Sequence, residues 1–190
     1  MDRSRPASPR LAPIAEAAEK ARQRATESTR VAVNALATLS HNRPVLAAMA
    51  KFRGTAFEEA TTSARHRELG ILRMGWNCQA VYEFGQHTLD CRRLGFTDDE
   101  IWLITRPLSE GRWIPSDRAV LQMVDDLYSD DCLTDTTWSV VTEHFSSSEI
   151  IELIVMVSYY RVVSGLLNTF GVESEPGVPG WPQAPAQPTS

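Results

Sequence analysis

The sequence predicts an all-α protein. Apolar residues recur every three or four positions along most of the chain, and no long stretch alternates between apolar and polar residues. The first pattern places apolar side chains on one face of a helix, whereas alternation would indicate a strand. Residues that favour helix starts, such as Ser63 and Thr97, and helix-ending glycines, such as Gly95 and Gly171, bound the periodic stretches.

The individual helices follow from the same signals in chain order. Segment 14–28 is rich in Ala, Glu and Arg, which have high helix propensity. Pro44 suits the first turn of the helix that follows it. Thr97 and Glu100 have capping-box spacing, and Ser116 and Thr134 are suitable N-caps. The predicted helices span 14–28, 31–39, 45–57, 63–76, 77–93, 97–104, 116–127, 134–145 and 146–170.

Segment 150–170 is the most apolar part of the chain. It approaches the roughly 20 residues that a helix needs to cross a bilayer. Glu152, Arg161 and Asn168 interrupt it, however. We therefore expect the central buried helix of a soluble core, with Tyr159 and Tyr160 as core residues, one of which is a candidate to reach a nearby site.

The chain divides into one domain and two tails. Residues 1–13 hold several Pro and Arg residues without periodicity, and residues 173–190 are rich in Pro. Both compositions are typical of disordered segments. The prediction is a disordered tail over 1–13, a single helical domain over 14–172 and a Pro-rich disordered tail over 173–190.

Composition excludes several classes of protein. Hydrophobic content of 43% and charged content of 23% are ordinary for a soluble globular protein. A net charge of −5 argues against binding to nucleic acid. The N-terminus lacks the apolar stretch of a secretory signal, so we expect a cytoplasmic protein that does not bind membranes. Three cysteines without C-x-x-C spacing indicate neither a disulfide framework nor a zinc site.

The stretch RELGILRMGWNCQAVYEFGQH, which ends at His87, carries the candidate catalytic residues. Glu83 and His87 are four residues apart, so on a helix they lie about 40° apart in projection. Glu68 lies on the preceding predicted helix. Two carboxylates that converge on an imidazole are suited to proton transfer.

Other interpretations of these three residues stay open. They are also a plausible charge network between two helices, and two carboxylates with one imidazole form a possible divalent metal site, although no second His lies in the motif. Cys91 follows His87 by four residues, so an imidazolium beside it would activate the thiol. A packed, unreactive Cys91 is the simpler interpretation.

The stretch RHRELGILRMGWNCQAVYEFGQH, followed by LGFTDDEI, resembles the core motif of the carboxymuconolactone decarboxylase family, which includes the alkylhydroperoxidase D-like proteins. The later stretches DRAVLQMVDDLYSDDCLTDTTW and HFSSSEIIELIVMVSYYRVVSGLLNTFGV are similar to the C-terminal half of its longer members. The resemblance spans residues 41–172. It implies an alkylhydroperoxidase D-like helical bundle that assembles as a trimer or a dimer of trimers, with sites near subunit contacts.

The resemblance also bears on chemistry. In the peroxidase branch a Glu precedes a C-x-x-C-x-x-x-H motif, and here Glu68 and His87 match the Glu and the His, but Ala80 and Glu83 occupy the cysteine positions. A disulfide-cycling peroxidase needs both thiols. The pattern instead resembles the decarboxylase-like branch, which removes a carboxylate from a lactone acid by proton transfer, without a cofactor.

We therefore expect His87 as general acid/base, Glu68 as its proton partner and Glu83 as a second carboxylate. Tyr82, Arg73 and Trp113 are the candidates for binding a small organic acid or lactone. No cofactor and no metal ion is expected. The alternatives are a hydroperoxide-reducing protein of the same family, which would depend on Cys91, and a non-catalytic ligand-binding scaffold.

Overall fold

The structure is a computed structural model, and it describes residues 5–24 and 32–184. Within these ranges the chain forms α-helices and short 3-10 turns and has no β-strand, so the predicted all-α class is confirmed. The end of the predicted helix 14–28 and the start of the next one lie outside the described residues. The α-helices are α1 (Ala15–Arg24), α2 (Val33–Leu39), α3 (Arg43–Glu58), α4 (Ala64–Asn77), α5 (Val81–Arg93), α6 (Asp98–Leu103), α7 (Pro115–Asp130), α8 (Asp135–His144) and α9 (Ser147–Phe170), and the 3-10 turns are η1 (Ser40–Asn42) and η2 (Leu108–Glu110).

Side chains that the sequence marks as caps begin four of the helices. The Ser63 hydroxyl accepts a hydrogen bond from the His66 N–H at the start of α4. Each such bond satisfies a backbone donor that has no partner inside the helix. The other three caps are Thr97 of α6, Thr134 of α8 and Ser146 of α9, of which the first and last complete capping boxes with Glu100 and Glu149.

Two helix starts differ from the prediction. Helix α7 begins at Pro115, with Ile114 rather than Ser116 as its N-cap, because proline fits the first helical position without needing its missing N–H. The predicted helix 77–93 begins only at Val81. Gln79 adopts a positive φ of 53°, which turns the chain sharply between α4 and α5.

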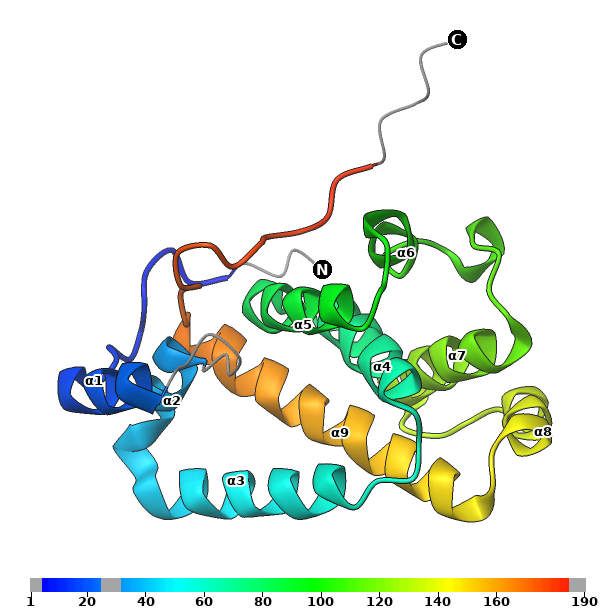
Figure 1. The fold of residues 1–190 in the computed structure, drawn as a ribbon, viewed down its shortest axis with the longest axis horizontal. Helices are drawn as coiled ribbons and strands as arrows, with labels where there is room; N and C mark the ends of the chain where they lie inside the picture. The colour runs from blue at the N-terminus through cyan, green and yellow to red at the C-terminus, as the bar shows by residue number, and fades with distance from the viewer. Residues whose placement is uncertain (1–4, 25–31, 185–190) are drawn as a thin grey trace, which may run out of the picture.

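Helix α4 lies at the centre of the molecule and contacts α5, α7 and α9 (Figure 1). Helices α7 and α8 pack together at one end, and α1 and α2 form a separate pair at the other. The largest fully buried side chains lie mainly on these central helices. They are Phe84, Leu69, Ile71, Leu72, Met74, Ile101, Ile104, Leu121, Met123, Leu153, Val120 and Val124.

Helix α9 is amphipathic in its packing although its sequence is apolar on most sides. Within the described residues it is the one helix long and apolar enough to cross a membrane by length and composition. Leu153, Val157 and Tyr160 on one face are buried, and α9 packs on α4 as expected of a core helix. The opposite face exposes Ile151 at 63% and Val162 at 57%.

Helix α3 has the least cover. It runs apart from α4 and α5 and approaches α9 toward one end (Figure 1). Among its described side chains none is fully buried, and Val45 is 50% and Phe52 44% exposed. A helix rich in apolar residues that packs so little on its own chain presents an unusual apolar surface.

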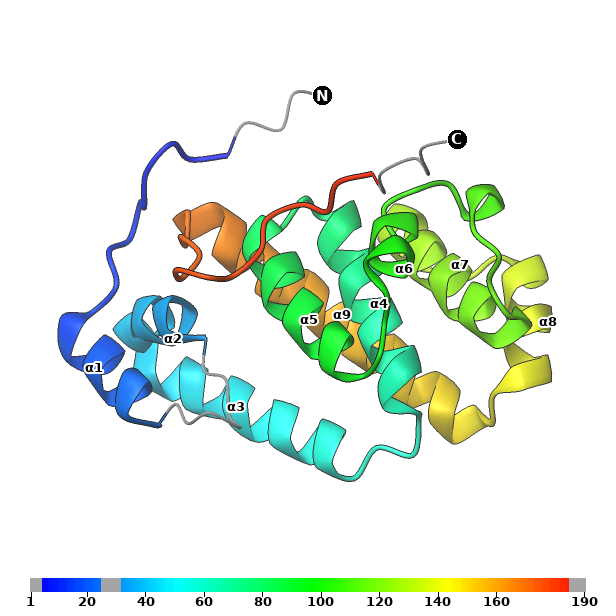
Figure 2. The ribbon, with the colours of Figure 1, turned by 45° about the horizontal axis from the view of Figure 1, so that its top comes forward.

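The described parts of the two tails lie against the domain without forming helices or strands. Arg5 donates hydrogen bonds to the carbonyls of Cys78 and Gln79. The C-terminal segment, shown in red, crosses α5 (Figure 2). The predicted division into one domain and two disordered tails stays a prediction, but residues 173–184 make defined contacts with the domain.

Candidate active site

The structure brings together the three residues predicted to be catalytic. Glu68 lies on α4, and Glu83 and His87 lie one turn apart on α5. The Nδ1 atom of His87 is 2.7 Å from Glu68 Oε2, and its Nε2 atom is 2.9 Å from Glu83 Oε1. Both imidazole nitrogens therefore face carboxylates, one from each helix.

Burial and charge fix the protonation state of this cluster. Side-chain exposure is 8% for His87, 7% for Glu83 and 15% for Glu68. Burial alone would lower the pKa of His87, but the charge of Glu68 and the hydrogen bonds that His87 donates to both carboxylates raise that pKa well above its usual value. His87 is thus an imidazolium at neutral pH and donates to both carboxylates.

The local sequence explains why these side chains meet. Leu69 and Leu72 beside Glu68 are fully buried, as is Phe84 beside Glu83, so the apolar faces of α4 and α5 hold the two helices together. The tight turn at Gln79 returns the chain antiparallel to α4, which sets α5 alongside it.

Two further residues adjoin the cluster. The Tyr160 ring meets the His87 ring edge-on, with centroids 4.9 Å apart, and Tyr160 is 3% exposed. This identifies Tyr160 as the tyrosine of α9 that reaches the site. Arg53 of α3, which the sequence analysis missed, interacts electrostatically with Tyr160 and Glu83. One signal was available, because no acidic residue lies three or four positions from Arg53 to neutralise it on a helix.

The predicted substrate-binding residues lie elsewhere. Arg73 is 7% exposed, and two of its nitrogens each donate to Asp125 at 2.7 Å, so Arg73 neither neutralises Glu68 nor faces an open site. The Tyr82 hydroxyl donates to Glu175 at 2.8 Å. Burial and the Glu175 charge raise the pKa of Tyr82, which keeps it protonated. Trp113 folds over Gly111 and packs on the core with its indole nitrogen buried.

Cys91 lies near the cluster but not as a reactive thiol. Its sulfur is 4.0 Å from Glu68 Oε2 and is fully buried. Burial and the nearby carboxylates of Glu68 and Asp90 raise the pKa of this thiol, which opposes formation of the thiolate. The arrangement favours the packed cysteine over the activated one.

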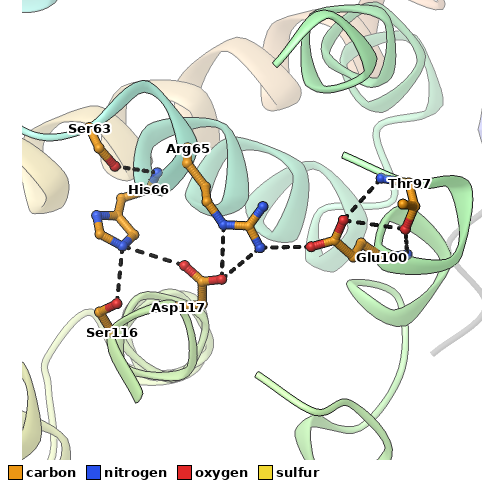
Figure 3. A network of polar contacts seen from close by, with 7 residues as sticks. All are labelled: Ser63, Arg65, His66, Thr97, Glu100, Ser116 and Asp117. Atoms are coloured by element: carbon orange, nitrogen blue, oxygen red, sulfur yellow. Dashed lines mark hydrogen bonds and ion pairs between the residues drawn. The ribbon is translucent and has the colours of Figure 1, made fainter. Parts of the chain in front are cut away.

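A second polar network joins α4, α6 and α7 (Figure 3). Arg65 bridges Glu100 and the buried Asp117 at 2.8 and 2.7 Å. Ser116 and Asp117 both approach the same nitrogen of His66, Nε2, at 3.3 and 3.4 Å. A Ser-His-Asp relay needs its two partners on opposite imidazole nitrogens, so this network ties helices together and is not a nucleophile site.

Within the described residues, no group of three or more His, Cys, Asp or Glu side chains is arranged to hold a metal ion. In the cluster around His87 both nitrogens already contact carboxylates, whereas a metal ligand must offer one nitrogen's lone pair. The geometry is that of a proton-sharing network.

Comparisons with known proteins agree with the resemblance in the sequence. Residues 43–126 match the model of the carboxymuconolactone decarboxylase family. No curated protein matches the chain.

Solved structures show the fold. A peroxidase-related protein from Ralstonia eutropha JMP134, described as an alkylhydroperoxidase AhpD core, is 16% identical with a TM-score of 0.75, covering 91% of this chain and 95% of its own. A protein of unknown function from Agrobacterium tumefaciens, assigned to AhpD antioxidant defence, is 16% identical with a TM-score of 0.68 and coverages of 72% and 94%. A peroxidase-related protein from Silicibacter sp. TM1040 is 13% identical with a TM-score of 0.63 and coverages of 72% and 73%. The predicted alkylhydroperoxidase D-like bundle is confirmed.

Proposed function

From the match of residues 43–126 to the model of the carboxymuconolactone decarboxylase family, we propose that this chain is a cofactor-free enzyme that transfers protons on a small organic acid or lactone. Decarboxylation, or a related step at a carbon acid, is the preferred reaction. One observation carries the proposal: His87 is bonded through both ring nitrogens to carboxylates on two helices. The network can hold a proton at one end and accept one at the other.

The proposed chemistry uses that network as a relay. When a lactone acid loses CO₂, the carbon–carbon bond breaks and its electron pair stays on carbon next to the carbonyl, where a proton must arrive. Glu83 receives a proton from His87 Nε2 and delivers it to that carbon. Glu68, the more exposed carboxylate at 15%, returns a proton from solvent to Nδ1. One proton is consumed per CO₂ released.

A specific observation also supports a hydroperoxide-reducing function. The similar solved structures are described as AhpD or peroxidase-related proteins. In this chain such a reaction would rest on Cys91, because Ala80 and Glu83 occupy the matched cysteine positions. The buried thiol with its raised pKa favours the acid–base proposal. Because Cys91 is buried, substitution tests it better than alkylation: Cys91→Ala should abolish turnover if the peroxidase function is correct and leave turnover intact otherwise.

We further propose that the protein is a cytoplasmic homo-oligomer, a trimer or a dimer of trimers. The exposed apolar side chains of α3 and α9 support this, since a surface with Val45, Phe52, Ile151 and Val162 exposed by 44% or more is typical of an interface. Neither membrane nor nucleic acid is a proposed partner.

The test compares CO₂ release from a panel of small lactone carboxylates by the wild type and the His87→Gln variant. We expect the variant to lose about 100-fold or more in rate, the range for a removed general acid or base. The matched control is His66→Gln, which alters a histidine of the second network and should keep the rate. Equal rates for the wild type and His87→Gln on every substrate turned over would refute the proposal.

The scaffold alternative predicts a different result from the same variants. If the cluster only joins α4 to α5, His87→Gln lowers the melting temperature and no substrate is turned over by any form of the protein. Thermal unfolding of both variants beside the turnover assay therefore separates a catalytic role from a structural one.

A further inference from the structure

A pocket of about 150 Å³ lies between the C-terminal part of α3 and the first half of α9. Its apolar walls are Ala56, Phe57, Ala60, Ile151, Val155 and Met156. A cavity of this volume with apolar walls accommodates a ligand the size of benzene. The pocket suits one ring or a branched aliphatic group.

The charged residues in the wall already have hydrogen-bond partners, whereas the Thr62 hydroxyl is buried without one. Glu152 accepts hydrogen bonds from the backbone N–H groups of Thr61 and Thr62 at 2.9 to 3.0 Å, and Arg67 donates to the Thr62 carbonyl. These contacts close the loop between α3 and α4. Apart from the Thr62 hydroxyl, the pocket interior therefore offers a ligand only apolar contacts, and any charged group of a ligand has to be bound outside the pocket.

Arg53 supplies a cation at the edge of this pocket. Its guanidinium carbon lies 5.6 Å from the centroid of the Phe57 ring, one wall of the pocket. Arg53 is exposed. Its guanidinium interacts with Tyr160 and with the charge of Glu83, but no described carboxylate lies within ion-pair distance of it. A planar guanidinium of this kind matches a carboxylate in a two-point hydrogen-bonded contact.

Phe57 connects the pocket to the candidate active site. Its ring meets the Tyr160 ring edge-on at 6.0 Å, and the Tyr160 ring meets His87 at 4.9 Å. Met156, another pocket residue, precedes Tyr160 by one turn of α9. A ligand with its body in the pocket and its charge on Arg53 would therefore lie next to Tyr160, on the side that leads to His87.

We infer that Arg53 and the Phe57 pocket form one binding site for a small monocarboxylate with a single apolar ring or branched chain. The carboxylate lies on Arg53 and the apolar body fills the pocket. As a substrate site this rests on the proposed function, and it narrows the substrate class from any small acid or lactone to an apolar monoanion. As a binding site it stands on its own geometry.

Benzoate is the probe, and its binding to the full chain is measured by calorimetry and by ligand-observed NMR. Arg53→Gln should weaken benzoate binding about tenfold, since it removes a charge-assisted contact. The matched control is Lys51→Gln, an exposed cation about 200° away on the same helix, which should change the affinity less than about twofold. Benzyl alcohol, the neutral analogue, should bind the wild type and Arg53→Gln equally.

Ala56→Leu tests the pocket itself. Because α3 has no fully buried described side chain, the variant should fold as the wild type does, and the added side chain should abolish binding of both probes. The inference is overturned if the wild type does not bind benzoate, including the case in which a second copy fills the pocket and Ala56→Leu alters only the oligomer. It is also overturned if the Arg53→Gln variant and the Ala56→Leu variant both bind benzoate as tightly as the wild type does.

The outcomes separate this inference from the proposed function. Benzoate binding that depends on Arg53, with turnover insensitive to His87→Gln, would leave the binding site in place and remove the relay. Turnover that depends on His87, without benzoate binding, would leave the relay in place and remove the proposed binding site.

Discussion

His87 stays charged although it is buried, because Glu68 accepts a hydrogen bond from one of its ring nitrogens and Glu83 from the other. The i, i+4 spacing of Glu83 and His87 was predictable because it is a local property of one helix. The contact of His87 with Glu68 was also predictable, because Glu68 lies on the helix that directly precedes α5 in the sequence. Tyr160 and Arg53 were harder to predict, because their approach depends on how α9 and α3 pack.

The raised pKa of His87 makes stability depend on pH. Its unfolded pKa is about 6.5 and its folded pKa is higher. The stabilisation is therefore complete below about pH 6.5 and is lost as the pH rises through the folded pKa. The difference in unfolding free energy between the wild type and His87→Gln should shrink from pH 6 to pH 9 in urea titrations. A difference for His87→Gln that stays constant with pH would contradict the assigned protonation state.

At the scale of elements, helix starts were the most predictable feature. Ser63, Thr97, Thr134 and Ser146 act as caps because capping depends on residues within one turn. A break between helices 63–76 and 77–93 was predicted, but the turn that separates α4 from α5 was not, since Gln79 takes its positive φ without a glycine or proline to mark the turn. The contacts of the C-terminal segment were missed because a Pro-rich composition says nothing of what surface receives it.

Those contacts centre on α5. Glu175 accepts hydrogen bonds from the Tyr82 hydroxyl and from Gln86, at 2.8 and 2.5 Å. Trp181 packs edge-on against Trp76 at 5.1 Å. The segment thus covers the side of α5 that carries Tyr82 and Gln86 and supports the helix that carries His87.

Gly85 is the position at which this segment approaches α5 most closely. A Cβ atom at Gly85 would lie 2.1 Å from the Pro179 carbonyl oxygen, so Gly85→Ala should displace the segment. We expect a loss of about 1–3 kcal/mol in unfolding free energy, and faster proteolytic cleavage within 173–184. Gly165→Ala on α9 is the control, because no heavy atom lies within 4 Å of its added Cβ. It should stabilise the helix by up to about 1 kcal/mol, and equal effects at both glycines would count against the docked segment.

At the scale of the whole molecule, the helical class was predictable because the periodicity carries it, and one motif was enough to predict the alkylhydroperoxidase D-like fold. The exposed face of α9 was not predictable. An apolar segment has the same sequence pattern whether its own chain or another copy of the chain buries it. The apolar composition of segment 150–170 predicts a buried central helix, whereas Ile151 and Val162 are exposed. The oligomer that the resemblance implies would supply the missing cover.

That oligomer is open to a direct test. Val162→Glu places a charge on the exposed face of α9 and should reduce the assembly to monomers in size-exclusion chromatography with light scattering. Leu94→Glu, at a residue that is 47% exposed and outside α3 and α9, should leave the assembly unchanged. Dissociation by both variants, or by neither, would contradict the proposed interface.

The central claim is that Glu83 receives a proton from His87 and exchanges it with a carbon acid. Proton NMR in D₂O reports this directly, as loss of the carbon-bound hydrogen signal of a small lactone carboxylate. The account predicts that the wild type catalyses exchange and that Glu83→Gln, which keeps the size of the side chain, slows it about 100-fold or more without unfolding the protein. Exchange at the wild-type rate in a folded Glu83→Gln variant would contradict it.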